Sequence, residues 1–118
     1  MTARLSVLVI EDEPLIAMMI EDFLDMLGHD VAGSADSVAA AVPRVEAGGF
    51  DVAILDVNLR DGACWPVADA LAARSVPFVI ATGGHVSPPP PVHADVPQLP
   101  KPFTMDGVKI ALERIAPR

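Results

Sequence analysis

Three short apolar runs alternate along the chain with segments whose apolar residues recur at helical spacing. The runs cover residues 5–10, 52–56 and 76–81 and are rich in β-branched side chains. Short apolar runs that end at turn signals are typical of strands buried on both faces of a sheet. Strands that alternate with helices over short connections form right-handed βαβ units. The sequence therefore predicts an α/β fold built on a parallel sheet.

Weaker patterns complete the set of elements. Two further strands are expected at residues 29–34 and 96–99. Residues that favour the start or the end of a helix flank each helical segment. They are Pro14, Gly28, Ser37, Gly48, Pro66 and Thr104. Pro43 should kink or shorten the second helix, because a proline removes one helical hydrogen bond.

The alternation breaks where a fourth helix is due. Residues 88–91 are four consecutive prolines, which remove successive amide donors and fix φ, so no regular helix can form there. We expect an extended, polyproline-like loop instead. The predicted fold is a flavodoxin-like, doubly wound sheet of five parallel strands in the order 2-1-3-4-5, with the fourth helix absent or replaced by this loop.

Charge and composition limit the partners and the compartment. The 118 residues carry a net charge of −8 with a pI near 4.5. This argues against non-specific binding to nucleic acid or to anionic membranes, although solubility alone accounts for most of the acidity. No apolar stretch approaches a membrane span, no signal peptide is evident, and the single Cys64 indicates a reducing compartment. We expect one domain over residues 1–118 in a soluble cytoplasmic protein.

Polar residues follow the predicted strands. Glu11 and Asp12 follow the first strand, Asp56 ends the third, Thr82 ends the fourth and Lys101 follows the fifth. The carboxyl ends of parallel strands lie along one edge of a sheet, and ligands of open α/β sheets bind there. The five side chains are therefore expected to converge.

Three convergent carboxylates need a counter-ion. At a separation of about 4 Å, each pair costs roughly 4 kcal/mol at an effective dielectric near 20. Carboxylate oxygens with open positions suit Mg²⁺, which retains waters and accepts substrate phosphate oxygens. A cation, Lys101 and the hydroxyl of Thr82 around a carboxylate nucleophile form a site for phosphoryl transfer, with Asp56 as the nucleophile.

The whole pattern resembles the receiver domain of two-component response regulators. The segments that carry the resemblance occur in the family's order and at similar spacing. They are residues 7–14 (VLVIEDEP), 54–62 (ILDVNLRDG), 81–83 (ATG) and 101–103 (KPF). The resemblance implies a phosphoacceptor that receives a phosphoryl group from a sensor histidine kinase and has no output domain of its own.

The resemblance also assigns roles to individual residues. Asp56 is expected to be the phosphoacceptor and a Mg²⁺ ligand. Asp12 is expected to bind Mg²⁺ directly, Glu11 through a water molecule, and Asn58 through its backbone carbonyl. Thr82 is expected to turn its hydroxyl toward the phosphoryl group.

Lys101 is expected to pair with a phosphoryl oxygen, and the resemblance implies a cis peptide bond between Lys101 and Pro102. One family feature is missing: Gln98 replaces the aromatic residue that lies three positions before the lysine in most receivers. We therefore hypothesise that residues 83–96 become ordered on phosphorylation and take over the readout.

A narrower resemblance points to single-domain receivers with a Pro-Phe-x-Phe-Ala-Thr-Gly-Tyr/Gly motif. Residues 66–71 (PVADAL) and 77–84 (PFVIATGG) match it, with Ile80 in place of the second Phe. Such receivers are often paired with histidine kinases of the HWE type. We expect output through contact with an unidentified downstream protein or action as a phosphate sink, with no role for nucleic acid or membranes.

Two alternative functions share part of the pattern. A Mg²⁺-dependent aspartyl-phosphate phosphatase or phosphotransferase has a second Asp as its general acid, where this chain has Asn58. A flavodoxin-type binder needs a hydroxyl- and glycine-rich phosphate loop after the first strand, where this chain has Glu11, Asp12 and Glu13. We expect a switch rather than a turnover enzyme.

Overall fold

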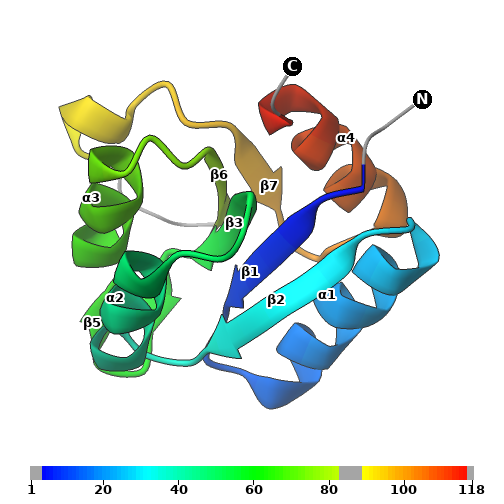
Figure 1. Ribbon diagram of the computed structural model, residues 1–118, viewed down its shortest axis with the longest axis horizontal. Coiled ribbons are helices and arrows are strands. Elements are labelled where there is room, and N and C mark those ends of the chain that lie inside the picture. The colour runs from blue at the N-terminus through cyan, green and yellow to red at the C-terminus, as the bar shows by residue number, and fades with distance from the viewer. Residues whose placement is uncertain (1–3, 83–88, 117–118) are drawn as a thin grey trace.

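The computed structural model describes residues 4–82 and 89–116 and contains a central five-stranded parallel sheet (Figure 1). The strands are β1 (Ser6–Ile10), β2 (Asp30–Ala35), β3 (Val52–Asp56), β6 (Phe78–Thr82) and β7 (Gln98–Pro100). Their spatial order is β2-β1-β3-β6-β7. This is the predicted order 2-1-3-4-5, because β4 (Asn58–Leu59) and β5 (Gly62–Ala63) form a separate antiparallel hairpin.

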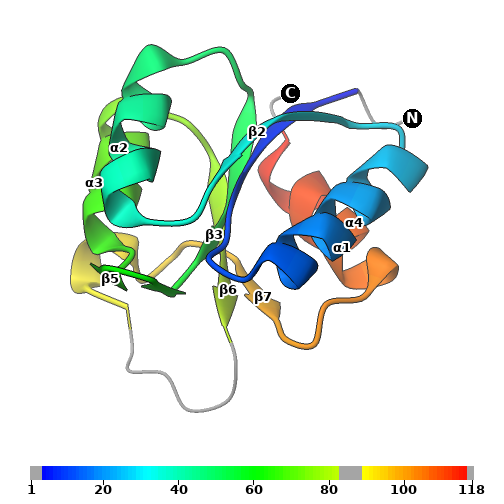
Figure 2. The same ribbon diagram turned by 90° about the horizontal axis from the view of Figure 1, so that it is seen from below.

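Helices cover both faces of the sheet. The helices α1 (Pro14–Met26) and α4 (Met105–Ile115) lie on one face, and α2 (Val38–Ala47) and α3 (Trp65–Ala73) lie on the other (Figure 2). Leu8, Leu55 and Ile80 of the central strands pack toward α2 and α3, while Val9 and Ile54 pack toward α1 and α4. The central strands are thus apolar on both faces, which is why they appear as continuous apolar runs in the sequence.

The helix caps follow the sequence, but the effect of Pro43 does not. The Ser37 hydroxyl accepts a hydrogen bond from the amide of Ala40 at 3.1 Å, and Thr104 caps α4 in the same way. Pro43 was expected to kink or shorten α2, and the helix is not shortened, because it continues past Pro43 to Ala47. Ala41 and Val45 are fully buried on either side of the proline, and their packing offsets the loss of one helical hydrogen bond.

The segment in place of a fourth helix is partly described. Residues 83–88 lie outside the described residues. They include Pro88 and the first six residues of the segment 83–96 that is expected to become ordered on phosphorylation. Pro90 has the extended φ of −53° and ψ of 149°, and a single 3-10 turn, η1 (Pro91–His93), follows it. No α-helix forms between residues 89 and 97, as the prolines predicted. The extended, polyproline-like backbone expected there is found at Pro90 but not from Pro91 to His93, where η1 forms and His93 is buried.

His93 fastens this turn to α3. Its ring stacks on Trp65 with centroids 6.0 Å apart and meets the ring of Phe78 edge-on at 5.9 Å. Its Nε2 lies 2.8 Å from a carboxylate oxygen of Asp69. The turn therefore has a defined place against α3 without being an α-helix.

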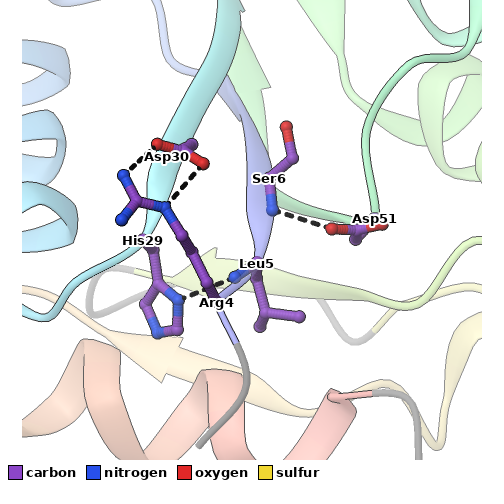
Figure 3. Close-up of polar contacts among 6 residues, drawn as sticks. All are labelled: Arg4, Leu5, Ser6, His29, Asp30 and Asp51. Atoms are coloured by element: carbon purple, nitrogen blue, oxygen red, sulfur yellow. Dashed lines mark hydrogen bonds and ion pairs between the residues drawn. The ribbon is translucent and has the colours of Figure 1, made fainter.

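Polar side chains join the amino ends of the strands, at the edge of the sheet remote from the predicted site (Figure 3). The amide of Leu5 donates a hydrogen bond to Nδ1 of the buried His29 at 3.0 Å, and Arg4 pairs with both carboxylate oxygens of Asp30. The amide of Ser6 donates to a carboxylate oxygen of Asp51 at 2.8 Å. These contacts set where β1 begins relative to β2 and β3.

Candidate functional site

Three carboxylates meet at the carboxyl ends of β1 and β3. Glu11 and Asp12 follow β1 directly, and Asp56 is the last residue of β3. One oxygen from each of the three lies within 4.8 Å of the other two. Glu11 and Asp56 are buried, with 4% and 6% of their surface exposed. The parallel pairing of β1 with β3 brings the acids together, as the sequence predicted.

Lys101 reaches this cluster from the far edge of the sheet. Its Nζ lies 3.1 Å from Oδ1 of Asp56 and 3.7 Å from Oε1 of Glu11. Its backbone amide donates a hydrogen bond to the carbonyl of Thr82 at 2.8 Å, which aligns the ends of β6 and β7. The peptide bond between Lys101 and Pro102 is cis, as the resemblance to receivers implied.

The crowding of like charges changes the acid–base properties of Glu11. Burial and the nearby Asp56 and Asp12 raise the pKa of Glu11 from 4.5 to about 8. Burial alone would lower the pKa of Lys101, but its hydrogen bond to Asp56 and the surrounding carboxylates raise the pKa above its ordinary value. Without a metal ion, Lys101 is the cation that compensates the three acids.

One oxygen in the cluster has an ion-pair contact with Lys101 but no hydrogen bond among the described residues. Oε1 of Glu11 is buried and accepts no hydrogen bond from the described part of the chain, whereas Oε2 accepts one from the amide of Glu13 at 3.2 Å. A buried carboxyl oxygen without a hydrogen bond is costly unless an ion or a water satisfies it. Three converging carboxylates with a spare oxygen fit a hard cation such as Mg²⁺.

The cleft around the cluster has a volume of about 240 Å³. Its lining consists of Glu11, Asp12, Glu13, Asp56, Val57, Asn58, Ala81 and Lys101. The structure thus brings together five of the six residues predicted from the sequence. Thr82, the sixth, ends β6 and bonds Lys101 through its backbone, but it does not line this cleft.

The sequence reasoning missed the structure of the segment that carries Asn58. Residues 58–63 form the hairpin of β4 and β5, and Asp61 in its turn accepts two hydrogen bonds from the start of α2. No local signal identifies this contact, since the donors lie 22 and 23 residues earlier in the chain.

The fold agrees with a comparison to known families. A model described as the response regulator receiver domain matches residues 7–95. This chain belongs to that family. The receiver assignment made from the sequence is thereby confirmed, and with it the placement of the chain in two-component signalling. Among the described residues, no helix has the length and apolar character needed to cross a membrane.

Individual relatives support the same assignment. The solution structure of SdrG from Sphingomonas melonis Fr1 is 55% identical, covers 98% of each chain and superposes with a TM-score of 0.83. The response regulator PhyR from Brucella abortus is 27% identical, covers 98% of this chain and 49% of its own, and has a TM-score of 0.81. The phyllosphere-induced regulator PhyR from Methylorubrum extorquens is 38% identical over 79 residues, which are 64% of this chain and 30% of that protein. This chain therefore spans about half of the Brucella abortus PhyR chain and less than a third of the Methylorubrum extorquens protein.

Proposed function

We propose that this receiver is a phosphoacceptor switch whose Asp56 takes a phosphoryl group from a phosphohistidine of a sensor kinase. The observation that carries the proposal is the position of Asp56. It is buried at the end of a central strand, with an ammonium group 3.1 Å away and two further carboxylates in the same cleft. A structural acid at the end of a strand needs neither neighbour.

The transfer step uses few groups. A carboxylate oxygen of Asp56 attacks phosphorus in line, the P–O bond forms, and the P–N bond to the kinase histidine breaks with its electron pair leaving on the imidazole. Lys101, already within hydrogen-bond distance of Asp56, is placed to bind a phosphoryl oxygen. The hydroxyl of Thr82 is proposed to bind a second one. Catalysis of this kind consists mainly of positioning and charge compensation.

A Mg²⁺ ion fits the acidic cluster because the donor atoms of the cluster are all oxygens and one of them, Oε1 of Glu11, accepts no hydrogen bond from the described residues. Asp12, Asp56 and the backbone carbonyl of Asn58 are proposed to hold it directly, and Glu11 through a water molecule. When bound, it supplies positive charge to the phosphoryl oxygens. The chain is proposed to carry out only its own phosphorylation and dephosphorylation, without turnover of other substrates.

The signal is proposed to pass through protein contact. A sensor histidine kinase of the HWE type is the proposed donor, and the proposed output is contact with a downstream protein or storage of phosphate. A structure of SdrG from Pseudomonas melonis Fr1, 58% identical to this chain, is described as the BeF₃-activated conformation. Beryllofluoride is therefore the reagent of choice for capturing the partner of the activated form.

Incubation with acetyl phosphate and Mg²⁺ tests the proposal. We expect one acid-stable, base-labile phosphoryl group, absent without Mg²⁺ and absent in Asp56→Asn. Asp51→Asn is the matched control, because Asp51 lies at the opposite edge of the sheet just before the same strand. Labelling that persists in Asp56→Asn, or rapid hydrolysis of unrelated phosphomonoesters, would contradict the proposal.

A further inference from the structure

The hairpin that follows Asp56 is fastened at its tip to the start of α2. Asp61 occupies the turn between β4 and β5. Its Oδ1 accepts a hydrogen bond from the amide of Val38 at 2.7 Å, and its Oδ2 accepts one from the amide of Ala39 at 3.0 Å. The neighbouring Arg60 lies 3.1 Å from a carboxylate oxygen of Asp36. Two adjacent side chains at the tip of the hairpin therefore contact residues 36–39. In Figure 1, β5 lies beside α2.

The same hairpin carries one wall of the acidic cleft. Asn58, its first residue, lines the cleft together with Asp56. Asn58 pairs with Ala63 across the hairpin, and the amide of Cys64 donates to the carbonyl of Val57 at 2.8 Å. The hairpin is thus a closed unit that continues from β3 and leads into α3, with Leu59 buried in the core and Asp61 holding its tip. Releasing the tip removes the hydrogen bonds that join it to the start of α2.

We propose that Asp61 is a positioning residue for the cation site, and that it holds the backbone of Asn58 in its place in the wall of the cleft, beside the acids of β1 and β3. This inference rests on the proposed Mg²⁺ site described above. Residues that orient a ligand without touching the metal contribute strongly to metal affinity, because they remove the cost of ordering that ligand on binding. Asp61 acts through Asn58 and does not itself enter the cleft.

The carboxylate of Asp61 suits this task. Two oxygens span two successive amides at a helix N-terminus, where the helix has unpaired donors and a positive partial charge. These two hydrogen bonds lower the pKa of Asp61, so the group stays ionised at neutral pH. An Asn at this position offers one acceptor oxygen, and an Ala offers none.

The chain provides a matched control in Ser37. Its hydroxyl caps the next amide of the same helix, that of Ala40, at 3.1 Å. Ser37→Ala and Asp61→Ala therefore both weaken the start of α2, but only Asp61→Ala also frees the hairpin. Urea unfolding measures the loss of stability at the start of α2, and calorimetric titration with MgCl₂ measures the effect of freeing the hairpin on Mg²⁺ affinity.

We expect both alanine variants to lose stability to a similar extent while only Asp61→Ala loses Mg²⁺ affinity. Its Kd for Mg²⁺ should rise about tenfold, the lower end of the effect of removing such a partner. Ser37→Ala should stay within about twofold of the wild type, and Asp61→Asn should fall between the two because it retains one acceptor. Should Asp61→Ala fail to fold, Asp61→Asn provides the same comparison.

The outcomes separate this inference from the function on which it rests. A Kd for Asp61→Ala or Asp61→Asn that matches Ser37→Ala would overturn the positioning role while leaving the Mg²⁺ site intact. A wild-type protein that binds no Mg²⁺ would refute the proposed site itself.

Discussion

Replacing Glu11 by Gln should stabilise the metal-free protein, because the wild type pays for a buried carboxyl among like charges. Glu11 is 4% exposed and shares its cleft with Asp56 and Asp12. Its pKa is raised from 4.5 to about 8. In the unfolded chain the same group ionises near its ordinary value. Glu11→Gln keeps the shape of the side chain and removes the charge.

The sign of the pH dependence follows from this difference. As pH rises from about 4.5 toward 8, the unfolded chain releases the Glu11 proton first, so the free energy of unfolding falls. One proton bound in the folded state and absent from the unfolded state gives a slope of about 1.4 kcal/mol per pH unit. Between pH 5.5 and 7.5 the stability of Glu11→Gln relative to the wild type should therefore grow by up to about 3 kcal/mol.

Urea unfolding of both proteins across this pH range, with a metal chelator present, measures the effect. The exposed Glu46 of α2 supplies the control, since Glu46→Gln should give a profile parallel to that of the wild type. Addition of Mg²⁺ should reduce the difference in free energy of unfolding between Glu11→Gln and the wild type. Binding to the folded state alone stabilises the wild type, whose metal site is intact. Parallel profiles for Glu11→Gln and the wild type in the absence of metal would refute the reasoning.

Three further predictions concern the rest of the molecule. Burial lowers the pKa of His29, which accepts a hydrogen bond from the amide of Leu5. The free energy of unfolding should therefore fall as pH drops below about 6.5. A urea midpoint that falls as steeply with pH in His29→Gln as in the wild type would count against this. Cys64 is fully buried, and its burial, with a smaller contribution from the charge of Asp56, raises the pKa of its thiol to about 12. Iodoacetamide should therefore modify Cys64 only in urea. Fast labelling of the native protein would contradict the burial. Leu55 is fully buried where β3 packs against α2 and α3. Leu55→Ala should lower the free energy of unfolding, measured with urea, by about 2–5 kcal/mol. A decrease below about 1 kcal/mol would show that the core closes around the cavity.

The central strands could be predicted because burial on both faces leaves a mark in the sequence itself. Ile54 and Leu55 are adjacent and point to opposite layers, so the strand appears as an unbroken apolar run. The candidate site residues could be predicted for a related reason: each ends a strand of the central sheet or lies within two residues of its end, and parallel strands end at one edge of the sheet.

The remaining features depend on partners that are distant in sequence. The strands of the hairpin have two residues each, too short for any periodic pattern. His93 is buried because Trp65, Asp69 and Phe78 surround it. No pattern in the sequence near position 93 predicts that burial. Pro43 shows the converse, since a strong local signal for ending a helix is overridden by tertiary packing.

The most direct test of the central claim is chemical mapping of the phosphorylated side chain. The wild-type protein is treated with acetyl phosphate and Mg²⁺ and then reduced with borohydride, which converts an aspartyl phosphate to homoserine, and its peptides are sequenced by mass spectrometry. We expect homoserine at position 56 and unchanged aspartate at positions 12 and 61. Homoserine at another acidic position, or none at position 56, would contradict the assignment of Asp56 as the phosphoacceptor.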